Sequence, residues 1–492
     1  MSNHDRKFKL IISTRLLSIL AVNGFLGILL ILVACKFGNA NNIWNLLLGC
    51  IILCVNMLFY LKSNVHQKAE LLILVAWELT IIIEMAYRIV RLNATPYRIL
   101  YVPDILCFLF FIEMSKRIKF KQANNIILLI TIVTGTLAAI FNLRNFDDYI
   151  HGIMLVIRIW GLYLYASTIS INLPKWTKWV FPVSMVAFFV ETAGGFNVDF
   201  RNGIFGYEYI GGLFQLLLII WLSKATVKDL RKKGKNYLWL KVIIVEIIFA
   251  LREAKVECLL LVVWIFILVL LLRKRLTIKV VMYPILIVAV GIIGWNMIPV
   301  ISPKWAYVFD NWSFFEIAYG GVLRMFYDTS TLSLSEFLQE EKFSTLNYIF
   351  GIGFGAAQPP AYYRFCFLDI SGLNGMPDSM WMSSLITKYY NSFSASLVFY
   401  RGIYDVIIDL GITGVLAFCS ILINCIFKSY KLCRSKDEDS NVIGAVGIWS
   451  AVYIFYRMMG YNIVVVPLAM MVFGVLFGMI EYRYRLEYIC KK

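Results

Sequence analysis

The sequence predicts an all-α polytopic membrane protein, and three observations support this fold class. Apolar residues make up 60% of the chain, the mean hydropathy is +0.75 and only 16% of residues are charged, which is outside the range of soluble globular proteins. Apolar runs of roughly 17–22 residues recur along the chain, and this length matches the hydrocarbon core of a bilayer. Short charged segments separate these runs. The chain is therefore expected to cross a membrane many times.

Fourteen apolar segments are candidates for membrane-spanning helices. Two of them, 179–191 and 238–251, are short, so a total of twelve or thirteen stays open. The helices are expected at residues 11–35, 42–61, 70–87, 99–114, 126–142, 150–171, 179–191, 208–222, 238–251, 257–272, 280–299, 402–427, 441–456 and 462–480.

The distribution of basic residues predicts the orientation. The chain has 47 Lys and Arg against 30 Asp and Glu, a formal net charge of +17. About 30 of these basic residues fall in loops of one parity, as the positive-inside rule expects. With fourteen spans, both termini are then cytoplasmic and segment 301–397 lies on the outer side. The positive charge thus reflects orientation in a lipid bilayer, and no nucleic-acid partner is expected.

Segment 301–397 divides the predicted chain into three parts, because its sequence is much more compatible with water than the rest. Residues 1–300 form the N-terminal transmembrane region with helices 1 to 11. Residues 301–397 form one large extracytoplasmic (periplasmic) loop between helices 11 and 12. Residues 398–492 contain helices 12 to 14 and a cytoplasmic tail.

A row of charged residues begins the first helix after this loop. Arg401, Asp405 and Asp409 are spaced i, i+4 and i+8, which places them on one side of an α-helix. Ordinary ion pairing, such as Arg401 with Asp405, is one explanation of the row. A functional polar site at the outer mouth of a membrane helix is the other.

Other charges fall in or beside apolar segments, where each costs roughly 2.5–3.5 kcal/mol on insertion scales. Arg88 follows Glu84 by four residues, Arg158 lies about two turns inside the sixth span, and Arg252 follows the ninth. Planar guanidinium groups suit phosphate oxygens, so several converging near the outer leaflet would hold a diphosphate. The further arginines expected on the outer side or its interface are Arg201, Arg324, Arg364, Arg401 and Arg457.

Three alternating glycines, Gly351, Gly353 and Gly355, occur within the predicted outer loop. Their spacing is not a dinucleotide-binding fingerprint. Glycine allows a close approach of the backbone to a ligand, and successive N–H groups can form an anion nest. A plain turn is the alternative interpretation.

Histidine is scarce, and His151 is the only one of three expected on the outer side. A Ser-His-Asp site or a histidine-rich metal site is therefore not expected there. No metal and no other cofactor is predicted, and acid–base chemistry would depend on carboxylates, tyrosines or the substrate itself.

Three local patterns resemble the bacterial O-antigen polymerases (Wzy type) and the related O-antigen ligases. Arg252 begins an outer turn before a Leu-rich span in FALREAKVECLLL. The sequence GGVLR, which ends at Arg324, precedes IFGIGFG. An acid stands two residues before a glycine in IIDLGITG, at Asp409 and Gly411. The resemblance covers roughly residues 248–425.

One difference separates the two branches of this family. Ligases carry a His-Asn pair upstream of that acid, where this chain has Tyr400 and Arg401. The difference favours a polymerase over a ligase. A flippase for lipid-linked oligosaccharides is the third reading, although the long outer loop and the lack of an internal repeat argue against it.

The resemblance implies a GT-C-like fold in the bacterial inner membrane and a metal-independent transfer of glycan from an undecaprenyl-diphosphate donor. The acceptor in a polymerase is the next lipid-linked repeat unit, and a chain-length-determining co-polymerase is a candidate partner. Arg252, Arg324 and Arg401 are then assigned to the diphosphate. Arg88, Arg158 and the three glycines are assigned to substrate binding. Tyr400, Asp405 and Asp409 are candidates to orient or deprotonate the acceptor hydroxyl.

Overall fold

The structure is a computed structural model of the 492-residue chain. The predicted helix at 11–35 and most of segment 301–397 lie outside the residues it describes, so the division into three parts stays a prediction. The described residues are 102–118, 122–143, 146–169, 211–231, 238–252, 255–272, 343–356, 402–460 and 467–490, with scattered positions between 50 and 76, between 181 and 193, between 282 and 300, and at 338 and 339.

Helices make up the described part of the chain, which contains no strand, and the predicted all-α class is confirmed. One of them, the short α15, was not predicted, because its six residues lie inside the expected outer loop. The helices are α4 (Val102–Ser115), α5 (Ala123–Phe141), α6 (Phe146–Thr168), α8 (Gly211–Arg231), α9 (Leu238–Leu251), α10 (Lys255–Leu272), α15 (Thr345–Phe350), α18 (Gly402–Cys433), α19 (Glu438–Gly460) and α20 (Pro467–Tyr488).

Several of these helices indicate a membrane protein. Within the described residues, 3 helical stretches are long and apolar enough to cross a membrane: Ala123–Phe141, Gly402–Cys433 and Glu438–Met459. Shorter apolar stretches occur at Ile105–Ser115, Gly152–Thr168 and Val256–Leu272. The total of fourteen spans stays a prediction.

Three helices continue six or more residues beyond their predicted ends. Helix α8 runs to Arg231, α18 to Cys433 and α20 to Tyr488, whereas the prediction ended each of them at the first basic residues. Lys and Arg are good helix formers, and their aliphatic stems pack on apolar surface while their charged ends reach water. Apolar runs therefore predict where a helix crosses the membrane and not where it ends.

Helix α18 is interrupted at Gly411, whose φ of 62° and ψ of −156° are not helical. A positive φ of this kind is accessible to glycine without strain. The interruption divides α18 into residues 402–410 and 412–433. Asp405 and Asp409 both lie in the first section, four residues apart, and so face the same side of it, as predicted.

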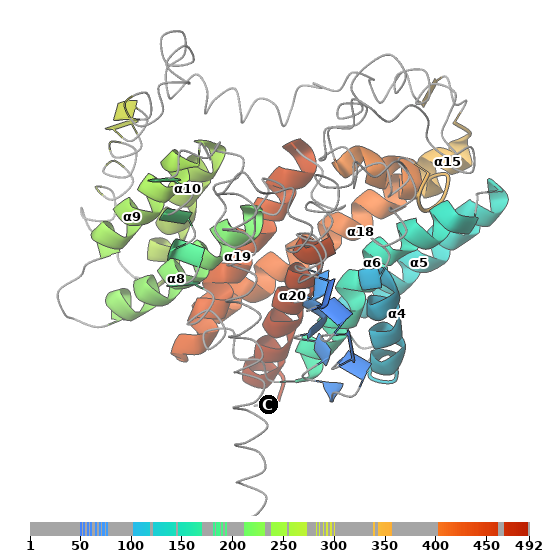
Figure 1. Ribbon diagram of the computed structural model, residues 1–492, viewed down its shortest axis with the longest axis horizontal. Helices are drawn as coiled ribbons and strands as arrows, with labels where there is room; N and C mark the ends of the chain where they lie inside the picture. The colour runs from blue at the N-terminus through green and yellow to red at the C-terminus, as the bar shows by residue number, and fades with distance from the viewer. Residues whose placement is uncertain are drawn as a thin grey trace, which may run out of the picture.

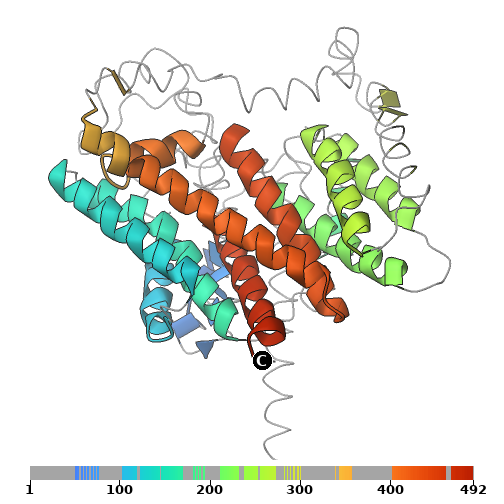
Figure 2. The same ribbon diagram turned by 180° about the vertical axis from the view of Figure 1, so that it is seen from behind.

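Helix α18 lies near the middle of the bundle (Figures 1 and 2). Helices α4, α5 and α6 lie on one side of it, and α20 packs against α6. Helices α8, α9 and α10 lie on the other side, where α19 separates most of them from α18. We call the end of the bundle at the α18–α19 connection the basic end. The opposite end, where α5 ends and α6 and α18 begin, is called the loop end.

Helices α6 and α20 approach each other closely at two glycines of α20. A Cβ atom at Gly474 would lie 2.6 Å from the carbonyl oxygen of Ile159, and one at Gly478 would lie 2.6 Å from that of Tyr163. Small residues four apart let the backbones of membrane helices come close together. This pair, in the sequence GVLFG, is the main reason why α20 fits against α6.

Aromatic side chains join α19 to α9 and α10. The ring of Trp449 lies 6.4 Å from that of Phe249, 5.8 Å from that of Trp264 and 6.1 Å from that of Tyr453. Trp264 also donates a hydrogen bond from Nε1 to the carbonyl oxygen of Ala445 at 2.9 Å. This contact satisfies a buried indole N–H that would otherwise destabilise the core.

At the basic end, Asn441 completes the last turn of α18. Its Nδ2 lies 2.9 Å from the carbonyl oxygen of Leu432, 3.0 Å from that of Cys433 and 2.9 Å from that of Ser435. The last carbonyl groups of a helix have no hydrogen-bond donor inside the helix, and the buried side-chain amide of Asn441 provides one here.

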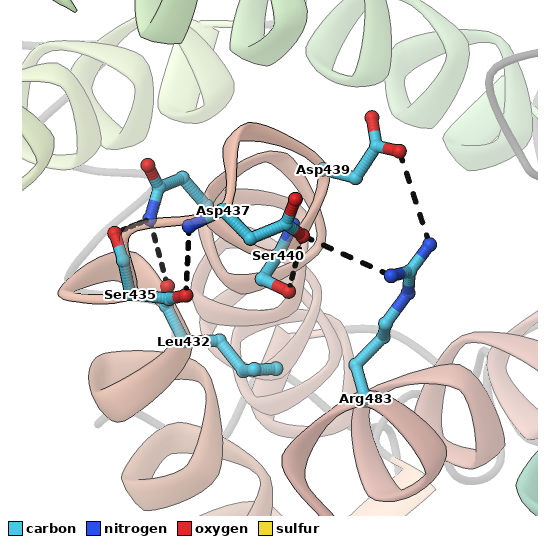
Figure 3. A network of polar contacts seen from close by, with 7 residues as sticks. Leu432, Ser435, Asp437, Asp439, Ser440 and Arg483 are labelled. Carbon is cyan, nitrogen blue, oxygen red and sulfur yellow. Dashed lines mark hydrogen bonds and ion pairs between the residues drawn. The ribbon is translucent and has the colours of Figure 1, made fainter. Parts of the chain in front are cut away.

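The next residues start α19 at the same place. Asp437 Oδ2 accepts hydrogen bonds from the backbone N–H of Ser440 at 2.8 Å and from its hydroxyl at 2.7 Å. Arg483 of α20 pairs with Asp437 at 3.8 Å and with Asp439 at 3.9 Å (Figure 3). Capping and ion pairs thus hold the connection between α18 and α19 against α20.

Buried polar contacts hold the second section of α18 in place. Lys428 forms an ion pair with Glu481 of α20, and both side chains are largely buried. Asn424 donates from Nδ2 to Oδ1 of Asn124 in α5 at 2.6 Å. Because these contacts reach two different helices, residues 412–433 form a fixed base for the section beyond the interruption.

Candidate functional site

Residues 351–356, which we call the glycine loop, are buried at the loop end of the bundle. The sequence predicted a water-compatible stretch on the outer side, yet each of these residues is buried and Phe354 is only 2% exposed. Helix α15 leads into the loop, and Ser344 caps α15 by accepting a hydrogen bond from the N–H of Asn347 at 3.2 Å. The loop therefore inserts among the helices instead of lying over them.

The interrupted part of α18 binds the backbone of the glycine loop. Ile352 donates its N–H to the carbonyl oxygen of Ile408 at 2.9 Å, and Gly353 donates to that of Asp409 at 3.0 Å. Carbonyl groups just before a helix interruption lose their partners four residues further on. The glycine loop supplies donors at this position, so the interruption and the loop stabilise each other.

The carboxylate of Asp409 also binds the loop. Its Oδ2 accepts the N–H of Gly355 and its Oδ1 accepts the N–H of Ala356, both at 2.9 Å. The side chain is buried, with 6% of its surface exposed. The loop thus forms an anion nest of the kind considered from the sequence, and here the anion is a carboxylate of the same chain. The assignment of Asp409 to the acceptor hydroxyl stays a prediction.

The close backbone approach expected of the glycines takes place against helices of the same chain. Gly353 has a φ of 106°, and a Cβ atom there would lie 2.4 Å from the Cα of Ala139 in α5. A Cβ atom at Gly152 in α6 would lie 2.2 Å from the backbone nitrogen of Gly355. The junction of the loop with α5, α6 and α18 therefore requires glycine on both sides. A contact of Gly351, Gly353 or Gly355 with substrate stays a prediction.

A second group of buried residues, which we call the arginine cluster, lies at the loop end of α8, α9, α10 and α19. Arg252 follows α9, is 9% exposed and lies with its guanidinium carbon 5.6 Å from the ring centroid of Phe214. Arg457, near the end of α19, donates from Nε to the hydroxyl of Tyr453 at 2.7 Å. Arg252 and Glu257 of α10 both lie close enough to Tyr453 to interact with it electrostatically.

The arginine cluster has the composition of an anion site. Arg457 of α19 and Arg252, which follows α9, both interact with Tyr453, and an aromatic ring lies beside each guanidinium group. Guanidinium groups bind phosphate oxygens in pairs of parallel hydrogen bonds, and stacking on a ring restricts their orientation. Such a group could bind a phosphate or diphosphate at the surface of the membrane.

The remaining predicted site residues lie outside the glycine loop and the arginine cluster. Asp405 is 9% exposed, one turn before Asp409 on the same side of α18. Arg158 is 1% exposed and lies twelve residues after Phe146, the first residue of α6, which is about 18 Å along the helix. Its predicted depth of about two turns inside the sixth span stays a prediction. Predicted site residues outside the described part are Arg88, Arg324, Tyr400 and Arg401.

Part of the arginine cluster was not predicted from the sequence. Arg457 was expected among the outer-side arginines suited to a diphosphate but was not assigned to the site, and Phe214 and Tyr453 were not predicted at all. A charged residue near the end of an apolar helix, with a tyrosine four residues before it on the same face, was an available signal. For Phe214 there was no comparable signal, because one aromatic residue in an apolar helix is ordinary.

Within the described residues, no group of three or more His, Cys, Asp or Glu side chains could hold a metal ion. The chain matches no protein-family model and no curated protein. The likeness to the O-antigen polymerases therefore rests on its sequence patterns and stays a prediction.

Proposed function

We propose that this protein is an O-antigen polymerase of the Wzy type. It joins undecaprenyl-diphosphate-linked repeat units by transferring the growing glycan from its lipid diphosphate to the incoming lipid-linked unit, without a metal ion. In this proposal the chain is a GT-C-like glycosyltransferase with fourteen spans in the bacterial inner membrane, and both termini are cytoplasmic. The loop end faces the periplasm, and a chain-length-determining co-polymerase is a candidate partner.

The arginine cluster is the observation that most supports this proposal. Outside the cytoplasm no nucleotide-sugar is available, so an activated sugar must arrive on a lipid, and its diphosphate lies at the level of the headgroups. Arg252 and Arg457 lie at the loop end of α9 and α19, where such a headgroup would enter. Two guanidinium groups at this depth need a reason, because charge is costly near the bilayer core.

The chemistry of transfer agrees with such a site. When the anomeric bond breaks, negative charge develops on the leaving diphosphate, and fixed guanidinium groups stabilise that charge without having to reorganise. Arg457 donates a hydrogen bond from Nε to the hydroxyl of Tyr453, and this bond restricts the orientation of its guanidinium group. In this proposal Asp405, in the first section of α18, orients or deprotonates the acceptor hydroxyl.

A knockout strain tests the proposed function. Loss of a polymerase leaves single repeat units attached to the lipid core, and a gel of surface glycan would show this one short band. Loss of a ligase or a flippase leaves no repeat unit on the core. A knockout of the second type would reject the polymerase in favour of one of those two functions.

Complementation of the knockout tests the arginine cluster. Arg252→Ala and Arg457→Ala are each expected to abolish long glycan chains while the protein level in the membrane stays normal. Arg434→Ala is the matched control, because Arg434 stacks on Tyr430 at the basic end, 4.9 Å from its ring centroid, and should leave chain length unchanged. Normal chain lengths in both cluster variants would remove the assignment.

A further inference from the structure

The Asp409 carboxylate is in a position that is unfavourable without the glycine loop. It lies at the C-terminal end of helix section 402–410, where the helix dipole is negative and repels an anion. Its two oxygens and the carbonyl oxygens of Ile408 and Asp409 accept four N–H groups, and all four donors come from the glycine loop. The loop therefore neutralises the end of this helix section, and a side chain that could not accept the last two bonds would lose half of the contact.

The same contact joins the two ends of a long segment. The chain leaves the glycine loop at Ala356 and returns at Gly402, where α18 begins. Ala356 is bound to Asp409, which lies in the helix section that Gly402 starts. One carboxylate thus joins the last residue of the glycine loop to the helix section that begins at Gly402. Predicted site residues Tyr400 and Arg401 belong to segment 357–401, and Asp405 follows it by one turn of helix.

We propose that Asp409 is a positioning residue that clamps the glycine loop to helix section 402–410 and sets the direction of that section. The clamp is a property of the fold, whereas its consequence for Asp405 in glycan transfer rests on the proposed function. Gly411 makes this arrangement necessary, because an interruption with φ of 62° releases section 402–410 from the direction of the rest of α18. Two of the four hydrogen bonds that join this section to the glycine loop end on the Asp409 carboxylate.

The geometry separates this role from that of a general base. A base must present an oxygen to the substrate hydroxyl within hydrogen-bonding distance. Both oxygens of Asp409 instead face backbone N–H groups at 2.9 Å, inside a junction where Phe354 is buried against α5 and α6. Asp409 therefore acts on the reaction through the position of Asp405.

Hydrogen exchange of the purified full-length protein in lipid nanodiscs tests the clamp without any activity assay. Asp409→Asn keeps one acceptor and turns an N–H₂ group toward the other loop N–H, and Asp409→Ala removes both acceptors. Hydrogen bonds to charged groups are strong enough that losing one should speed the opening of the loop about tenfold or more. We expect amide exchange at residues 351–356 to rise in Asp409→Asn and to rise further in Asp409→Ala.

Two comparisons make this measurement decisive. Asp405→Asn is the matched control, a carboxylate one turn away on the same helix face, and it should leave exchange at residues 351–356 unchanged. The capped connection at Asp437 and Asn441 reports global folding and should stay protected in every variant. Unchanged loop exchange in Asp409→Ala, or equal loss of protection at both ends of the bundle, would overturn the clamp.

The pH dependence of glycan chain formation separates positioning from catalysis. If Asp409 positions, the residual activity of Asp409→Asn is lower with the same pH profile as the unaltered protein. If Asp409 were the base, the variant would lose the acidic limb of that profile, and the positioning role would be rejected. A failure of the polymerase proposal in the knockout strain leaves the exchange result intact, so the two proposals fail separately.

Discussion

Gly152→Ala in α6 is the sharpest test of how the loop end is packed. The added methyl group would lie 2.2 Å from the backbone nitrogen of Gly355, 2.6 Å from the carbonyl carbon of Phe354 and 2.8 Å from its Cβ. All three atoms belong to the glycine loop or its first side-chain carbon, so no side-chain rotation relieves the overlap. The loop must move away from α6, and it carries its bonds to Asp409 with it.

The size of the effect follows from the contacts. Carbon atoms pack at about 3.5–4.0 Å, so the loop backbone must shift by roughly an ångström or more. Overpacking of this kind costs about 1–3 kcal/mol, and a weakened bond to a buried carboxylate adds about 1.5–3 kcal/mol. We expect a net destabilisation of about 3 kcal/mol, which shifts the equilibrium between the closed and the open loop by a factor on the order of 100.

Gly161→Ala in the same helix is the matched control. Its methyl group would meet Phe111 Cα at 3.5 Å, an ordinary contact. Both substitutions gain the same roughly 0.5–1 kcal/mol of helix propensity, so their difference isolates the overlap. Heating the detergent-purified variants with a thiol-reactive dye measures this difference, because buried thiols such as Cys258 and Cys425 add to the constant signal of the exposed Cys54 and Cys490 when the protein unfolds. Gly152→Ala should unfold at a clearly lower temperature than Gly161→Ala, and equal unfolding temperatures would refute the packing of the loop against α6.

Two further substitutions test how α20 is held against α18 and α6. Lys428→Met leaves Glu481 buried without its cation and should destabilise the protein by about 3–5 kcal/mol, whereas the double variant with Glu481→Leu should recover most of that loss. The same dye assay checks this, and a double variant no more stable than the single one would contradict the pairing. Gly474→Ile should separate α6 from α20 and lower the yield of folded protein more than Gly474→Ala does, because the bulkier side chain meets the same backbone carbonyl. Similar yields from both variants would argue against close contact there.

The helices were predictable because apolar runs are a direct record of burial in lipid. Helix α9 occupies the predicted residues 238–251, and α10 begins two residues before its predicted start. The ends of α8, α18 and α20 were not predictable from hydropathy, because the basic residues that leave the apolar zone continue the helix. The pairing of Asn424 with Asn124 was also not predictable, since the sequence does not show which polar residues in different apolar runs contact each other.

The candidate site was predictable only in its parts. Asp409, Gly411 and the alternating glycines were all recognised as unusual, and the row that contains Asp405 and Asp409 was correctly placed on one helix side. The contact between the glycine loop and Asp409 was not predicted, because Gly355 and Asp409 are 54 residues apart and no local pattern connects them. Reading IFGIGFG as an exposed stretch followed from its glycines and its polar neighbours. Burial of the loop depends on matching glycines in α6 and α18, which only the three-dimensional arrangement reveals.

The sequence separation of the bond between Ala356 and Asp409 has a consequence for how the protein is made. The glycine loop leaves the ribosome before α18 does, since its acceptors lie 53 and 54 residues downstream. Four backbone N–H groups of the glycine loop lack their final acceptors until α18 has been inserted. These groups must stay hydrogen-bonded to water until then, so the loop stays outside the apolar bundle. The loop end is therefore completed late in biogenesis, and a nascent chain released before residue 402 would lack the helix section that holds the glycine loop against α5 and α6.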